Sequence, residues 1–126
     1  MGWILNSDKP IYLQIIDKLS SDIAAGIYSP GDRLPAVREF ALEASVNPNT
    51  MQKALSELER AGLVYSRRTS GRYITEDLEL IEQYKQKLAS EEIQQFLTQM
   101  QRLGFDKEQT IQLIKEEPSH EPTDHL

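Results

Sequence analysis

Apolar residues recur every three or four positions near the N-terminus of the chain, which is the spacing of one face of an α-helix. Pro10 suits the first turn of such a helix, and Gly26 suits a C-terminal cap. The pattern therefore predicts a helix from about residue 10 to residue 25. The stripe consists of Ile11, Ile15, Leu19 and Ile23.

Two shorter helices follow a loop that contains Pro30 and Gly31. We expect them over Pro35–Ala44 and Pro48–Ala61, joined by a tight turn through "SVN". Asn47 is a good N-cap for the second of these helices, because its side-chain oxygen can accept a bond from an amide of the first turn. A pair of short helices with such a connection is the helix-turn-helix layout.

The stretch "LVYSRRTSGRYIT", residues 63–75, has strand-forming residues on both sides of a polar centre. Ser70 and Gly71 supply the turn, so the stretch predicts a β-hairpin. A hairpin directly after a recognition helix is called a wing, and this one carries Arg67, Arg68 and Arg72.

Charge is concentrated in the part of the chain that holds these elements. Residues 33–75 have 7 Lys/Arg against 4 Asp/Glu, a net charge of +3, although the whole chain has a net charge of −6. Screening at physiological salt limits the range over which each exposed charge acts to about 8 Å. A local basic patch can therefore still attract a polyanion. The acidic total therefore does not exclude nucleic acid as a partner.

The same region supplies groups that can contact bases. Asn and Gln side chains can bond adenine, and amides at a helix N-terminus can bind phosphate. Each of these residues also has a purely structural interpretation: Asn47 caps its helix, Thr50 can satisfy local backbone, and an arginine can be a solvated surface charge. The polar residues near the start of the third helix are Asn47, Asn49, Thr50, Gln52 and Lys53.

Other functions find little support in the sequence. The 126 residues include no cysteine, no glycine-rich phosphate loop and only two histidines, and no segment is apolar enough for a membrane span. Both histidines lie in the C-terminal stretch "EEPSHEPTDHL", which is typical of a disordered tail rather than a metal site. We therefore expect a cytoplasmic, non-enzymatic protein with no cofactor and no metal.

Residues 76–117 predict a long helix that ends at Gly104 and a short last helix capped by Asp106 and Gln109. The apolar spacing slips at "ASEE", which suggests an irregularity in the long helix. Two helices cannot enclose this apolar stripe, so we expect it to form a symmetric dimer; packing back on the first domain is the alternative. The residues predicted for dimerisation are Leu78, Ile81, Leu88, Ile93, Phe96, Leu97, Met100, Leu103, Ile111 and Ile114.

The stretch from "GDRLPAVREF" to "SRRTSGRYI", together with "PIYLQI", resembles the winged helix-turn-helix of the GntR family of bacterial transcription regulators over residues 10–75. "VNPNT" and the tail "FLTQMQRLGFDKEQTIQLIKE" resemble its short-tailed YtrA-like subgroup. The resemblance implies a homodimeric repressor, often of an ABC transporter operon. It also implies DNA contacts at Arg38, in the recognition helix and at the wing tip. Many relatives have arginine where Pro48 and Gln52 stand, and a glycine where Thr69 stands.

The expected fold is mainly α with a small β-hairpin. It comprises a winged helix-turn-helix over residues 1–75, a helical dimerisation segment over 76–117, and a tail over 118–126. The expected function is sequence-specific binding to an inverted repeat of double-stranded DNA; the alternative is a winged-helix module that binds protein. No small-molecule effector can be named. The residues predicted to contact DNA are Arg33, Arg38, Asn47, Pro48, Asn49, Thr50, Gln52, Lys53, Arg67, Arg68, Thr69, Ser70 and Arg72.

Overall fold

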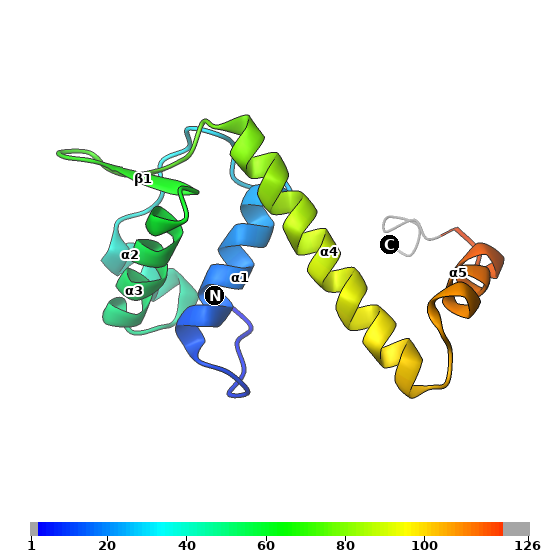
Figure 1. Cartoon of the computed structure of the whole chain (residues 1–126). Coiled ribbons are helices and arrows are strands. Elements are labelled where there is room, and N and C mark those ends of the chain that lie inside the picture. The colour runs from blue at the N-terminus through cyan, green and yellow to red at the C-terminus, as the bar shows by residue number, and fades with distance from the viewer. Residues whose placement is uncertain (1–2, 120–126) are drawn as a thin grey trace. The chain divides into compact units, whose positions relative to one another are not determined.

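A computed structural model describes residues 3–119 of the chain (Figure 1). It contains two compact units, the first ending at Leu88 and the second beginning at Ala89. This division falls later in the chain than the functional boundary expected after residue 75, which remains a prediction. No helix of the described residues is both long and apolar enough to cross a membrane. The elements are α1 (Ile11–Ala24), α2 (Val37–Ala44), α3 (Pro48–Arg60), β1 (Val64–Arg67), β2 (Gly71–Ile74), α4 (Leu78–Arg102) and α5 (Lys107–Glu116).

The first unit is built around α3, which contacts α1, α2 and β1. The helical stripe predicted for α1 is confirmed, since Ile15, Leu19 and Ile23 are buried and Ile11 packs against the core. Burying a side chain of this size stabilises the fold by roughly 1.5–3 kcal/mol. The other fully buried large side chains of this unit are Phe40, Met51, Leu55, Leu58, Leu63, Val64 and Ile74.

The connection between α2 and α3 turns sharply at Ser45. Ser45 has a left-handed backbone with φ of 59°, and the amide of Val46 donates to the carbonyl of Ala41 at 2.9 Å. Such a left-handed residue ends a helix and redirects the chain within a few residues. Asn47 then begins α3, as the sequence predicted.

The hairpin extends from the end of α3 as a wing (Figure 1). Val64 pairs with Ile74 and Ser66 with Arg72, in antiparallel register. The loop before α2 pairs with the other edge of β2, because the amide of Leu34 donates to the Arg72 carbonyl at 2.9 Å. Both edges of β2 are therefore paired, which fixes the base of the wing.

The N-terminal segment before α1, which we call the strap, packs against the core through Trp3. The Gln14 side chain donates to the carbonyls of Asn6 at 2.7 Å and Lys9 at 2.8 Å, and it accepts the Asn6 amide at 3.0 Å. Trp3 then meets the Phe40 ring edge-on, with centroids 5.5 Å apart. The sequence analysis did not predict this strap.

The first turns of α4 belong to the first unit, where Ile81 and Tyr84 pack against its core. The helix runs unbroken through the "ASEE" stretch, so the expected irregularity there was wrong. Ala and Glu are strong helix formers, and the slip in apolar spacing changes the apolar face without breaking the backbone.

The start of α5 confirms the predicted capping box. The Asp106 carboxylate accepts the Gln109 amide at 2.8 Å, and the Gln109 side chain accepts the Asp106 amide at 2.9 Å. Of the expected tail, residues 120–126, including both histidines, lie outside the described residues.

Candidate nucleic-acid interface

The start of α3 presents polar groups to solvent. Asn47, Pro48 and Asn49 are exposed, and Thr50 is partly buried. The Asn47 side chain accepts the Asn49 amide at 2.7 Å, so the predicted cap is confirmed. Pro48 has no amide proton to satisfy at the first helical position. A helix N-terminus with exposed amide side chains can approach DNA bases or phosphates.

The exposed face of α3 continues toward its C-terminal half. The Gln52 amide donates to the Ser56 hydroxyl at 3.4 Å, so these two side chains lie along one face. The ammonium of Lys53 lies 3.9 Å from the centre of the Tyr12 ring on α1. This cation–π contact directs Lys53 toward α1 and stabilises the helix pair.

Two of the predicted arginines lie before and at the start of α2. Arg38 is exposed in the first turn of α2, and no ion pair within residues 3–119 engages it. Arg33 is exposed beside the wing. Its guanidinium lies close to Gly71, where an added Cβ would be 3.4 Å from the Arg33 Nε. Gly71 also has φ of +108°, which favours glycine.

One face of the wing orders the Arg67 side chain. Tyr65 and Tyr73 stack with centroids 5.7 Å apart, and the Arg67 guanidinium lies 5.1 Å from the Tyr73 ring centre and 5.7 Å from the Tyr65 ring centre. Its bond to the Tyr65 hydroxyl, at 3.5 Å, raises the pKa of Arg67 above its ordinary value. The guanidinium, which is always charged in a protein, is held against two aromatic rings.

The tip of the wing carries Arg68, Thr69 and Ser70. Arg68 and Thr69 are exposed and Ser70 is partly buried. The Ser70 amide donates to the Arg67 carbonyl at 3.3 Å, which closes the turn. The tip thus presents a cation and a hydroxyl to a partner.

The other face of the wing is joined to α3. The Arg72 Nε donates to the Glu59 Oε1 at 3.1 Å, and the Ser66 hydroxyl donates to the same oxygen at 2.9 Å. Glu59 and Ser66 were absent from the sequence prediction. The hairpin register could have indicated Ser66, because it sets Ser66 opposite Arg72. The acidic partner on α3 required the tertiary structure.

The second unit presents the predicted apolar residues around α4 and α5. Ile93, Phe96, Leu103 and Ile114 are 42–72% exposed. Thr110 is fully buried, and its hydroxyl donates to the Asp106 carbonyl at 2.8 Å. Exposed apolar side chains that gather into one patch mark interaction sites.

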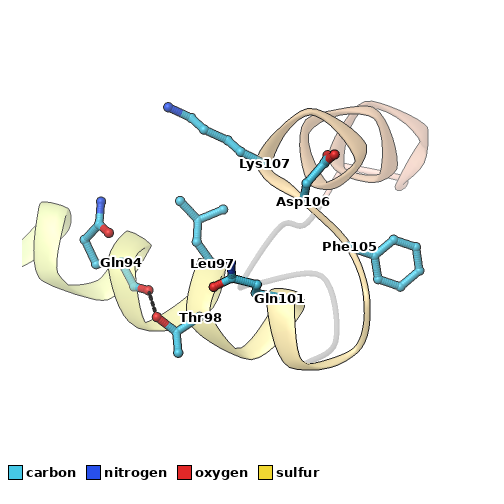
Figure 2. Close-up of a pocket in the computed structure, with 7 residues that line it drawn as sticks. All are labelled: Gln94, Leu97, Thr98, Gln101, Phe105, Asp106 and Lys107. Atoms are coloured by element: carbon cyan, nitrogen blue, oxygen red, sulfur yellow. Dashed lines mark hydrogen bonds between the residues drawn. The ribbon is translucent and has the colours of Figure 1, made fainter.

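A small groove lies within this unit, with a volume of about 190 Å³. Figure 2 shows Leu97 pointing from α4 into the space beside α5, with the Thr98 hydroxyl bonded to the Gln94 carbonyl at 2.9 Å. Small-molecule sites are commonly about 300–1,000 Å³, so this groove is smaller than a typical ligand pocket. Its lining residues are Gln94, Leu97, Thr98, Gln101, Phe105, Asp106 and Lys107.

Residues 11–74 match the sequence model of the bacterial regulatory proteins of the gntR family. The chain belongs to the GntR family. The matched range contains α1 to β2, and hence the winged helix-turn-helix described above. The expected fold class is confirmed, including the two C-terminal helices.

Full-length relatives have the same short organisation. The HTH-type transcriptional regulator YhcF of Bacillus subtilis is 45% identical over 109 residues, which cover 86% of this chain and 90% of YhcF. The HTH-type transcriptional repressor YtrA of the same organism is 38% identical over 111 residues, covering 87% and 85%. A GntR family transcriptional regulator from Listeria monocytogenes has a similar structure, with a TM-score of 0.82 at 38% identity, covering 90% of this chain and 100% of that one.

These similarities confirm the short YtrA-like type of GntR protein. The chain is a DNA-binding transcriptional regulator and not an enzyme. The predicted DNA-contact residues lie together in the first unit, on α2, α3 and the wing or just before them. Arg72 and Lys53 already have partners within the chain. Whether each residue touches DNA remains a prediction.

Proposed function

We propose that this GntR protein is a dimeric repressor that binds an inverted-repeat operator. The observation that carries the proposal is that the polar start of α3 and a wing with three arginines belong to one compact unit. The similar YtrA protein is named a transcriptional repressor. We place this protein with its DNA in the cytoplasm, and an ABC transporter operon is the first candidate target.

In this proposal, the start of α3 reads base edges in the major groove. Asn47, Asn49 and Gln52 have the donor and acceptor groups needed for bases, and they are exposed. Arg38 and Arg68 lie on neighbouring elements and neutralise phosphates, which fixes the register of the helix on the duplex. Arg67, which is held against the stacked Tyr65 and Tyr73 rings, also neutralises a phosphate.

The apolar residues of the second unit form the dimer contact. Phe96 is 42% exposed and Leu103 is 72% exposed, although both are large apolar side chains. A second copy of the same surface would cover them with twofold symmetry. Ile81 already packs in the first unit, so we assign most of the contact to residues after Leu88.

A dimer would place two recognition helices on one face of the duplex. Successive major grooves are about 34–36 Å apart, which sets the half-site spacing of an inverted repeat. Repression would follow from occupancy of the promoter. An effector could release the protein only through different affinities for two arrangements of the DNA-binding units.

A pair of matched substitutions tests the dimer. Phe96→Asp places a charge on the exposed apolar surface, whereas Gln95→Asp adds the same charge at an exposed polar position next to it in sequence. We expect wild type and Gln95→Asp to have a dimer mass by light scattering, and Phe96→Asp to have a monomer mass and weaker binding to an inverted repeat. A monomeric wild type, or a dimeric Phe96→Asp, would contradict this assignment.

A further inference from the structure

A polar groove of about 500 Å³ lies between α3 and the wing in the first unit. It is open to solvent and has charged and hydroxyl side chains on both sides. Three come from α3 and two from the hairpin, so the groove joins the two elements that the proposed function places on DNA. Its lining residues are Ser56, Glu59, Arg60, Ser66 and Arg72.

We propose that this groove holds a backbone phosphate of the operator, bound by Arg72, and that Glu59 and Ser66 position Arg72 for that contact. The inference deepens the proposed function and rests on it. Arg72 acts on the DNA, whereas Glu59 and Ser66 are positioning residues.

The geometry of Arg72 supports this role. Its Nε is bound to the Glu59 Oε1 at 3.1 Å, and its side chain is only 19% exposed. No hydrogen bond among the described residues uses the two terminal amino groups of Arg72, and the side chain borders the groove. A guanidinium has five donors in a planar fork, so one edge can bind a carboxylate while the others bind a phosphate.

The Glu59 carboxylate holds both strands of the wing through one oxygen. Ser66 and Arg72 are cross-strand partners, and both donate to the Glu59 Oε1. This shared acceptor fixes the Arg72 side chain before DNA arrives. A preorganised guanidinium loses less side-chain entropy when it binds.

The groove is continuous with the polar face of α3. Gln52 donates to Ser56, and Ser56 lines the groove. A DNA strand that passes from the start of α3 to the wing tip at Arg68 would cross this region. Its phosphate would meet the terminal amino groups of Arg72.

The test measures DNA affinity against salt concentration for Arg72→Ala, Glu59→Ala, the double variant and Glu59→Gln. The probe is a duplex that the wild type selects. One lost phosphate contact lowers the salt slope by roughly 0.9, and a lost charge-assisted bond weakens binding roughly tenfold. We expect Arg72→Ala and Glu59→Ala each to show both effects, with no further loss in the double variant. Glu59→Gln keeps the acceptor oxygen and should keep the wild-type slope.

The direction of the Glu59→Ala effect is decisive, because removing a negative charge near DNA would otherwise tighten binding. The control Glu43→Ala removes an exposed carboxylate from α2 and should not weaken binding. Phosphate-ethylation interference adds a positional readout. Ethylation of one particular phosphate should block binding by the wild type but should have no effect on binding by Arg72→Ala or Glu59→Ala. The effect of ethylation at the other phosphates should be the same in all three proteins.

Three results would overturn the inference. They are tighter DNA binding by Glu59→Ala, an unchanged salt slope in Arg72→Ala, or a Glu59→Ala variant in which ethylation no longer interferes with binding at several phosphates at once. The last result would mean that Glu59 only anchors the wing. In each case a wild type that still binds its duplex leaves the proposed function standing. A folded wild type that binds no duplex would remove the proposed function and this phosphate site together. Thermal melting of every variant establishes that the changes do not reflect unfolding.

Discussion

Asn47 combines two roles that substitutions can separate, the cap of α3 and a predicted contact with bases. Its side chain accepts the Asn49 amide at 2.7 Å, and its carbonyl accepts the Met51 amide at 3.0 Å. Pro48 has no amide proton, so only the amides of Asn49 and Thr50 depend on a partner outside the helix. Asn47→Ala removes the side-chain partner of the first of these two.

The expected cost follows from this geometry. Water can partly replace the lost bond because Asn47 and Asn49 are exposed. Loss of an N-cap then destabilises the protein by about 1 kcal/mol. For a unit of this size, the change lowers the melting temperature by roughly 4–8 °C. Far-ultraviolet circular dichroism would measure it as loss of the helical signal on heating.

Asn47→Ser is the matched variant, because serine is also a good N-cap but lacks the amide group that bonds adenine. We expect it to melt close to the wild type and to bind the selected duplex about 10- to 100-fold more weakly, which is the scale of a lost base contact. Fluorescence anisotropy measures this affinity. If Asn47→Ala has the same melting temperature as the wild type, the capping argument fails. If Asn47→Ser binds DNA as the wild type does, Asn47 is a cap only.

Two further predictions concern charge. Arg38→Ala and Arg68→Ala should each weaken binding across all sequences and lower the salt slope by about 1, whereas Glu82→Ala on α4 should not; equal slopes in all variants would exclude these arginines as phosphate contacts. Burial raises the pKa of Tyr28 above its ordinary 10.0, and the charges of Asp22 and Glu43 add to the effect. Its neutral phenol therefore contributes stability that is present below about pH 10 and is lost as the pH rises through the raised pKa. Tyr28→Phe should flatten the fall in melting temperature above pH 10, and an unchanged profile would contradict this.

The local signals in the sequence were sufficient for most of the fold. Asn47 with Pro48, and Asp106 with Gln109, marked the starts of two helices because a cap depends on residues within one turn. Apolar spacing located the buried face of α1, because each position of an amphipathic helix faces either the core or water. These features need no knowledge of distant residues.

Tertiary contacts were beyond the sequence. Arg72 was predicted only as a wing cation, and its bond to Glu59 joins residues 13 positions apart. Lys53 was predicted at the start of the recognition helix, and its contact with Tyr12 depends on how α1 packs against α3. Such partners are set by the packing of whole elements, which the local pattern does not encode.

The central claim, sequence-specific binding by a dimer, is tested most directly by selecting bound DNA from a random duplex pool with the full-length protein. The mass of the protein in solution is measured on the same sample. The account predicts an enriched inverted repeat and a dimer mass. A folded dimer that enriches no sequence, or a monomer that enriches a single half-site, would contradict it.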